Sequence, residues 1–193
     1  MEIAEKSITE KSEKCFDFWF KFPCSLEKGH NYGYNSKGSF LFARVLPKIG
    51  IPDSGIVMQL GSNFCVSFDI LYRKYGERAL GIDLWNPLDH PNVDEINVYD
   101  LPDINLAFCH VDSGHFQFTP ALRTYSIEYA IRNTLQGGAI ITAGGNYVNE
   151  CLGVNLNEKF LDNGFTIKSC KDYTDETVLD KIGVQHEIIA IKN

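Results

Sequence analysis

Residues Ile56–Asp83 read IVMQLGSNFCVSFDILYRKYGERALGID and predict the centre of the fold. A short apolar run opens the stretch and passes into a turn at Gly61. The apolar side chains that follow recur at helical spacing, and Gly76 lies where a left-handed helix end is expected. A second apolar run then ends in Asp83. The stretch therefore predicts a strand, a glycine turn, a helix and a second strand parallel to the first.

Gly61 and Asp83 also suggest a ligand site within this unit. A glycine at the end of a strand lets the backbone approach a ligand, because no β-carbon stands in the way. The acid follows the glycine by 22 residues, close to the spacing of about 20 expected for a carboxylate that binds a ribose diol. The alternative is an ordinary unit in which Gly61 only makes a turn and Asp83 only caps a backbone group.

The composition limits the classes of function. Hydrophobic residues make up 44% of the 193-residue chain, enough for one full core. The net charge of −7 and the absence of a basic cluster argue against nucleic acid as the main partner. No long apolar run or signal segment is present, so we expect no membrane association and a cytoplasmic location. The cysteines are scattered, which fits a reducing compartment: Cys15, Cys24, Cys65, Cys109, Cys151 and Cys170.

The chain divides into two parts. Residues 1–38 combine a charged start, an aromatic segment and a loop rich in glycine and asparagine, and we expect a helical segment or lid there. Residues 39–193 should form the folded domain. Within it, Phe40–Leu46 is predicted to be a short helix that Pro47 ends.

Strands and helices alternate through the rest of the domain. Two helices are predicted, one beginning at Thr119 and Pro120 and ending after Gln136, and a weaker one at Val154–Asn163. Further strands are predicted at Ile96–Tyr99, Ile104–Val111, Ala139–Thr142, Gly164–Cys170 and Val184–Ile191. Since no strong helical pattern separates the last two strands, they should pair as an antiparallel hairpin.

This order predicts an α/β fold: a Rossmann-like doubly wound sheet, mostly parallel, with a C-terminal antiparallel hairpin. Three successive strand ends carry acids, namely Asp83, Asp100 and Asp112. In an open parallel sheet a ligand lies outside the carboxyl ends of the strands. We therefore expect these acids to converge on one crevice.

From about Tyr34 to its end, the chain resembles the class I S-adenosylmethionine-dependent methyltransferases, in particular a small-molecule O-methyltransferase branch. The segment VMQLGSNFCVS is similar to the family's first motif, and HVDSGHF (His110–Phe116) resembles its strand-four segment. LQGGAIITAGG (Leu135–Gly145) resembles its turn into strand five. The terminal hairpin distinguishes this family from Rossmann domains that bind nicotinamide cofactors.

The resemblance implies S-adenosylmethionine as cofactor and a small molecule as methyl acceptor, and the chain could pair as a homodimer. It implies that Asp83 holds the ribose and that Asp100 faces the adenine. The full set of cofactor residues that it implies is Gln59, Gly61, Ser62, Asp83, Leu84, Asp100 and Leu101.

For catalysis we expect His115, which follows Asp112 by three residues, to act as the base. Asp112 could be the base instead, or could orient His115. The alternative for His115 is a cap on the next helix or a contact with Phe116. His110 is a weaker rival, because strand alternation would turn it toward the layer that covers the sheet.

Two departures from the family pattern bear on activity. Gln59 stands where the family usually has an acid, and Cys65 stands where another glycine is common. Metal-using members carry acids after strand five, where this chain has Ala143 and Gly144, so we expect no metal. The first departure keeps open a module that binds without catalysis. A nicotinamide-dependent oxidoreductase is a third hypothesis, disfavoured because the chain lacks G-x-G-x-x-G.

Overall fold

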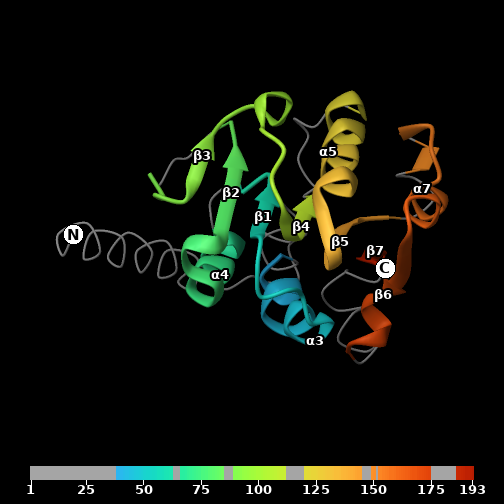
Figure 1. The fold of residues 1–193 in the computed structure, drawn as a ribbon, viewed down its shortest axis with the longest axis horizontal. Coiled ribbons are helices and arrows are strands. Elements are labelled where there is room, and N and C mark those ends of the chain that lie inside the picture. Colours follow the sequence, from blue (N-terminus) through green and yellow to red (C-terminus); the bar gives the residue numbers. More distant parts are fainter. Residues whose placement is uncertain are drawn as a thin grey trace, which may run out of the picture.

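A computed structural model describes residues 38–62, 66–84, 89–111, 120–144, 149–150, 152–174 and 186–193. Within these ranges, one seven-stranded sheet has the strand order β3-β2-β1-β4-β5-β7-β6 (Figure 1). The strands are β1 (Ile56–Leu60), β2 (Ala79–Asp83), β3 (Val93–Glu95), β4 (Leu106–Val111), β5 (Thr134–Ala143), β6 (Phe165–Ser169) and β7 (Glu187–Lys192). β7 runs antiparallel to both β5 and β6, while the other pairs are parallel. The predicted Rossmann-like fold with its terminal hairpin is confirmed.

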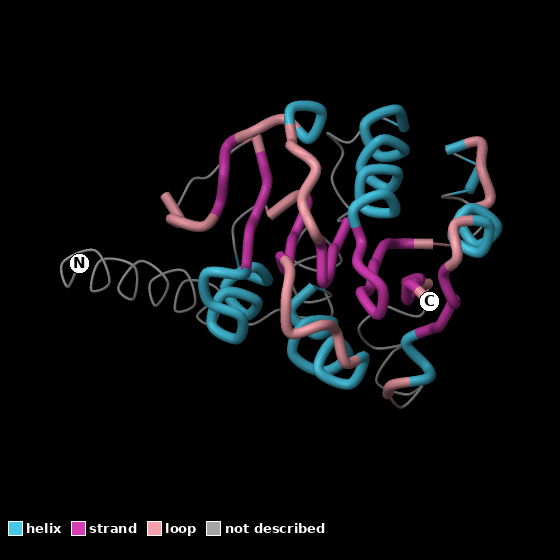
Figure 2. Tube along the Cα trace, viewed as in Figure 1, coloured by secondary structure: helices cyan, strands magenta, loops and turns pink. Residues whose placement is uncertain are grey.

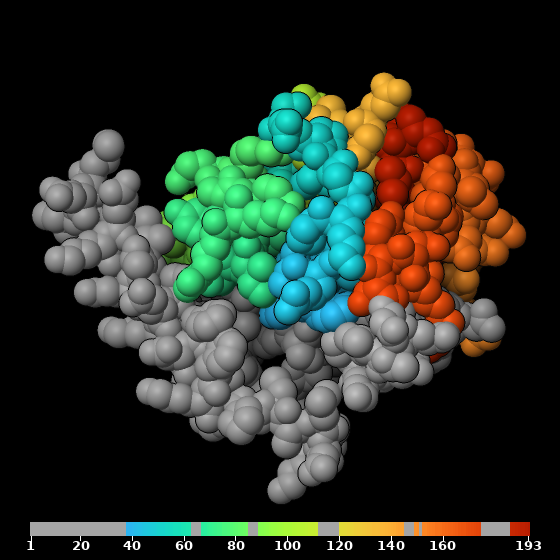
Figure 3. Space-filling model, turned by 90° about the horizontal axis from the view of Figure 1, so that it is seen from below, coloured from blue at the N-terminus to red at the C-terminus, as the bar shows by residue number. Residues whose placement is uncertain are grey.

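Helices cover both faces of the sheet, as Figure 2 shows. The α-helices are α3 (Leu46–Ile49), α4 (Val66–Tyr75), α5 (Pro120–Asn133) and α7 (Leu156–Asp162). Short helical turns are η1 (Leu41–Val45), η2 (Gly76–Arg78), η3 (Val98–Asp100) and η4 (Cys170–Asp172). η1, α3 and α4 share one hydrophobic core with the sheet, and α5 and α7 share a second core on its opposite face. Figure 3 shows η1 and α3 (blue) beside α4 (green) on the first face.

The two central strands, β1 and β4, are almost wholly buried and mostly apolar because each face meets a helical layer. Every residue of β4 is buried. Alternation sends Phe108 to the core under η1 and Cys109 to the core under α5. The predicted central buried strand at Ile104–Val111 is thus confirmed, with its first two residues left outside β4.

The first βαβ unit also matches its prediction. α4 ends at Tyr75, and Gly76 follows with a φ of 57°, the left-handed value expected of a glycine after a helix. β2 then runs to Asp83, so the predicted carboxylate does lie at the end of that strand. Residues 63–65 lie outside the described residues.

The prediction that Pro47 ends the first helix is wrong. Helical structure continues through α3 to Ile49 and ends at Gly50, whose φ is 74°. The preceding segment, η1, is a π-helical turn, and the N–H of Leu46 bonds the carbonyl oxygen of Leu41, five residues back. Proline lacks an N–H and clashes with the carbonyl group four residues before it. The wider π turn accommodates Pro47 at the start of α3.

The predicted strand at Ile96–Tyr99 is also wrong. The strand that pairs with β2 is β3, three residues earlier, and Val98–Asp100 is a 3₁₀ turn. The side chain of Asn97 accepts a hydrogen bond from the N–H of Tyr99 at 3.1 Å and so starts this turn. Local capping therefore outweighs the β propensity of the apolar residues on either side of Asn97.

α5 is shorter and β5 longer than predicted. The helix ends at Asn133, and β5 begins at Thr134 and runs through Gly137 and Gly138. Gly137 has a φ of 75°, and the pairing of β4 with β5 changes register in this region. The two glycines therefore lie in an irregular strand instead of ending a helix.

The C-terminal elements agree with prediction within a few residues. α7 lies inside the predicted helix at Val154–Asn163, and Asn155 caps it by accepting hydrogen bonds from two backbone N–H groups. β6 and β7 form the predicted hairpin. The predicted lid lies, apart from residue 38, outside the described residues, so the division into residues 1–38 and 39–193 stays a prediction.

Candidate functional site

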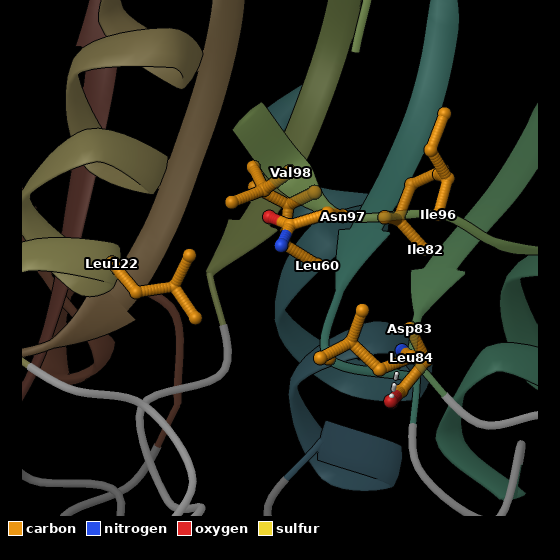
Figure 4. A pocket seen from close by; sticks show the side chains of 9 residues that line it. Leu60, Ile82, Asp83, Leu84, Ile96, Asn97, Val98 and Leu122 are labelled. Atoms are coloured by element: carbon orange, nitrogen blue, oxygen red, sulfur yellow. Dashed lines mark hydrogen bonds between the residues drawn. The ribbon is translucent and has the colours of Figure 1, made fainter. Parts of the chain in front are cut away.

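An open hollow lies at the carboxyl ends of β1 and β2 (Figure 4). From β1 the chain moves outward through β2 and β3 and then returns to β4 on the other side. The hollow therefore lies beside the switch point where ligands bind in open α/β sheets. The residues that line it are Leu60, Gly61, Ile82, Asp83, Leu84, Ile96, Asn97, Val98 and Leu122.

Gly61 forms the turn at the end of β1. Its φ is 84°, a value that side chains rarely adopt, so the position requires glycine. The N–H of Gly61 donates to the carbonyl oxygen of Ile82 at 2.8 Å, and the N–H of Ser62 reaches the same oxygen at 3.4 Å. Both donors thus join the turn to β2, and what Gly61 offers a ligand is close approach to its bare α-carbon.

Gln59 and Ser62 brace this turn from inside and do not line the hollow. Both side chains are buried. The Nε2 of Gln59 donates to the Oγ of Ser67 on α4 at 3.0 Å. The Oγ of Ser62 donates to the carbonyl oxygen of Gln59 at 3.3 Å. An amide at position 59 therefore ties β1, the turn and α4 together through neutral hydrogen bonds.

Asp83 and Leu84 both line the hollow. The Oδ1 of Asp83 accepts a hydrogen bond from the N–H of Leu84 at 2.7 Å, which fixes the carboxylate at the end of β2. Asp83 is partly buried, while 62% of Leu84 is exposed. An apolar side chain so exposed at the rim of a hollow is suited to covering a ligand.

The other two predicted cofactor residues lie beyond the lining. Asp100 is exposed in η3, and Leu101 follows it. The structure brings the residues just before them to the hollow, namely Ile96, Asn97 and Val98. The sequence does not point to these three residues, because their segment resembles a strand, in which side chains would alternate between two packed faces.

Leu122 is a further lining residue that the sequence did not single out. In Figure 4 it projects from α5 on one side of the hollow, with Asp83 and Leu84 at the end of β2 on the other. One turn along α5, the ring of Tyr125 lies 4.5 Å from the ring of Tyr99, centroid to centroid. Leu122 and Tyr125 fit the helical apolar pattern, which by itself indicates only a buried face.

The predicted catalytic residues, His115 and Asp112, lie outside the described residues. Their rival His110 is buried on β4, with its ring centroid 5.0 Å from that of Phe42 in η1 and edge-on to it. His110 thus packs into the layer that covers the sheet, as strand alternation predicts. Nearby, Arg123 of α5 donates to the carbonyl oxygen of Ala143 at 3.2 Å, which places a cation at the carboxyl end of β5.

Across the described parts of the chain, no cluster of three or more histidine, cysteine or acidic side chains is arranged to hold a metal ion. In the same residues, no helix has both the length and the apolar character needed to cross a membrane.

No family model matches the sequence, and no curated protein matches it. Solved structures do resemble the fold. DesVI of Streptomyces venezuelae is similar at a TM-score of 0.59 and 7% identity, over 94% of this chain and 98% of that one. A sugar N-methyltransferase of Streptoalloteichus is similar at a TM-score of 0.57 and 8% identity, over 92% of each chain. A magnesium protoporphyrin IX methyltransferase of Synechocystis, with bound S-adenosylhomocysteine, is similar at a TM-score of 0.56 and 11% identity. The match covers 92% of this chain and 94% of that one.

Proposed function

Because the chain has the fold of the class I S-adenosylmethionine-dependent methyltransferases, we propose that it methylates an oxygen, or a nitrogen, of a small molecule with S-adenosylmethionine as donor. The observation that carries this proposal is the hollow at the ends of β1 and β2. It places a glycine turn beside a strand-end carboxylate at the switch point of the sheet.

The residues of the hollow suit an adenosine group. A carboxylate such as Asp83 accepts hydrogen bonds from both hydroxyls of a ribose. The apolar side chains of Leu84, Val98 and Leu122 suit the flat faces of a base. Gly61 leaves room for the part of the ligand that continues past the end of β1. When bound, the cofactor supplies a methyl group on a positively charged sulfur.

The protein's own contribution to methyl transfer is chiefly to hold the acceptor in line. If the acceptor is a hydroxyl, a base must also take its proton, and we assign this role to His115, with Asp112 as its orienting partner or its substitute. This assignment rests on the sequence, because both residues lie outside the described ranges.

We propose that no metal takes part. Metal-using members of the family carry acids after strand five, where this chain has Ala143 and Gly144. A β-carbon at Gly144 would lie 2.5 Å from the Cγ1 of Ile188 and 2.9 Å from the carbonyl oxygen of His186. An acid at this position would therefore displace β7, so the local packing favours the neutral residue found there.

A second candidate is a module that binds a ligand or partner without transferring a methyl group. Gln59 favours it, because an amide stands where the family usually has an acid and its hydrogen bonds lie inside the protein. The uncharged hydrogen bonds of Gln59 hold the turn in place, and a binding module needs such a turn as much as an enzyme does.

Two measurements, made one after the other, test these candidates. Calorimetric titration with S-adenosylmethionine, S-adenosylhomocysteine and NAD establishes which ligand binds. A screen of small hydroxyl and amine compounds, read by release of S-adenosylhomocysteine, then tests turnover. Binding of S-adenosylhomocysteine with turnover supports the enzyme, and binding without turnover on any acceptor class supports the module. Binding of NAD alone would overturn the methyltransferase.

A further inference from the structure

Two walls of the hollow belong to one excursion of the chain. Ile82, Asp83 and Leu84 line the hollow just before the excursion, and Ile96, Asn97 and Val98 line it just after. Before the second group the chain passes through a turn at residues 89–92 and then through β3, while residues 85–88 lie outside the described residues. The pairing of β2 with β1 already holds Ile82 and Asp83, so whatever holds this turn and β3 in place bears chiefly on the wall made by Ile96, Asn97 and Val98.

His90 anchors the turn on α4. Its side chain is buried and lies between two aromatic rings of that helix. The centroid of its ring is 5.0 Å from that of Phe68 and 5.1 Å from that of Tyr72, with interplanar angles of 79° and 86°. Both pairs are therefore edge-to-face, a favourable arrangement for aromatic rings.

The turn is also fastened to its own backbone and to β2. The Nδ1 of His90 accepts a hydrogen bond from the N–H of Asn92 at 3.2 Å, and the carbonyl oxygen of His90 accepts one from the N–H of Val93 at 3.1 Å. The Nδ2 of Asn92 donates to the carbonyl oxygen of Ala79 at 3.1 Å. The backbone carbonyl oxygen of Asn92 accepts a hydrogen bond from the N–H of Gly81 at 2.8 Å.

The backbone at Asp89 adds a second indication that this turn is held in place. Its φ is 48°, and among the described residues it is the one non-glycine residue with a positive value. A residue in that region is kept there by its surroundings at some conformational cost.

We propose that His90 is a positioning residue for the cofactor site: its neutral ring locks the turn that leads into the wall made by Ile96, Asn97 and Val98, and protonation of the ring releases that wall. That His90 holds the turn follows from the packing alone. That its protonation weakens cofactor binding rests on the proposed function.

The chemistry of the ring explains the release. Because Nδ1 accepts a hydrogen bond, the neutral ring carries its proton on Nε2, and that atom is buried. A second proton would have to enter at Nδ1, where it would face the N–H of Asn92. The wedged position also keeps the resulting charge away from water.

The charges that face His90 only partly offset this effect. Burial lowers the pKa of His90 from its ordinary value of 6.5, and the negative charge of Asp69 on α4 opposes the shift. Asp69 is itself paired with Arg73 at 2.6 Å, which limits its help. Among the described residues, the phenol of Tyr72 on α4 is a further titratable group beside the ring, and Asp89, whose side chain is exposed, directly precedes His90 in the turn.

The direction of the pH effect follows. With the turn closed, His90 resists a proton; with the turn open, it takes one with an ordinary pKa near 6.5. The open state therefore gains stability as the pH falls below about 6.5. Its population should rise by up to about tenfold for each pH unit, until the closed state also takes up the proton.

Amide hydrogen exchange on the full chain tests the lock without any ligand. The peptide that spans residues 79–98 contains three of the backbone amides whose hydrogen bonds hold the turn, those of Gly81, Asn92 and Val93. When exchange rates are corrected for their intrinsic pH dependence, the protection of this peptide should fall about 5- to 10-fold more than that of β4 between pH 7.5 and 5.5. His90→Gln, which cannot take up a proton, should abolish this difference, and His186→Gln, at an exposed site, should leave it unchanged. Equal loss of protection in the excursion and in β4 would overturn the proposal.

Titration with S-adenosylhomocysteine supplies the second arm. The wild-type dissociation constant should rise about 5- to 10-fold from pH 7.5 to 5.5, and that of His90→Gln should stay within about twofold. Failure of the wild type to bind at pH 7.5 would refute the proposed function, while the exchange arm would still decide whether His90 holds the excursion. Equal pH dependence in both proteins would refute the link from His90 to the site.

Discussion

Gly81 and Ser62 approach each other so closely that a β-carbon on Gly81 would lie 2.5 Å from the Oγ of Ser62. The same β-carbon would lie 2.7 Å from the Cγ2 of Val93, so it would have neighbours on both sides. Ser62 belongs to the turn after β1, and its Oγ bonds the carbonyl oxygen of Gln59. The absence of a side chain on β2 therefore allows the glycine turn to close against the neighbouring strand.

Replacement of Gly81 by alanine should cost both stability and affinity. The added methyl group must displace Ser62 or Val93, and overpacking of this kind costs about 1–3 kcal/mol of unfolding free energy. Since Ser62 follows Gly61, we expect weaker binding of S-adenosylhomocysteine as well. Urea denaturation and calorimetric titration measure the two effects.

Gly50→Ala is the matched control for that variant. Gly50 has a φ of 74°, and nothing lies within 4 Å of the β-carbon it lacks. The substitution should cost about 1–2 kcal/mol through backbone strain alone and leave ligand affinity unchanged. If both variants lost affinity equally, general destabilisation would account for the effect of Gly81→Ala.

Asp83→Ala should weaken S-adenosylmethionine binding by about 1.5–3 kcal/mol, the range for hydrogen bonds to a charged group. The carboxylate lies at the end of β2 and not in the core, so the unfolding free energy should change little. Asp103→Ala, an exposed acid paired with Arg132, serves as the control and should bind normally. An unchanged dissociation constant in Asp83→Ala would remove this residue from the site.

Methyl transfer should survive chelation of metals. Since Ala143 and Gly144 offer no carboxylate after β5, turnover should be the same with EDTA and without it, and added Mg²⁺ should not raise it. Turnover that stopped on chelation and returned with the metal would contradict our interpretation of this loop.

His115→Ala should lower turnover by about 10²–10⁴-fold while S-adenosylmethionine affinity stays nearly intact, provided that the acceptor is a hydroxyl. A base that titrates near neutral pH also predicts an acidic limb in the pH profile of turnover, and the variant should lose that limb. Steady-state rates with a saturating acceptor measure both. A variant that turned over at the wild-type rate would leave positioning alone as the source of catalysis.

The sequence predicts those elements whose signals lie within a few residues of one another. β4 is apolar except for His110 because it is covered on both faces, and that pattern can be recognised without knowledge of its neighbours. Gly76 and Asn155 mark helix ends through their own backbone or side-chain chemistry. The errors fall where two local signals compete: at Pro47, at Ile96–Tyr99 and at the glycines of β5.

The candidate site was only partly predictable for the same reason. Gly61 and Asp83 were found because each stands at a strand end, and strand ends can be read from the sequence. Leu122 could not be assigned to the hollow, because its helical spacing indicates an apolar face without telling what that face meets. Gln59 was expected near the cofactor, whereas the direction of its side chain depends on Ser67 of α4.

By itself, then, the sequence determined the alternation of strands and helices, the terminal hairpin and the strand that bears Asp83. These follow from periodicity and chain order, which act over short distances along the chain. Only the tertiary structure decided that Gly81 leaves room for Ser62, that Val98 and Leu122 complete the hollow, and that His90 wedges against α4. Each of these depends on the register of neighbouring strands or on how a helix packs on the sheet. A one-residue shift in strand register would turn each side chain to the opposite face, so no local pattern can specify such contacts.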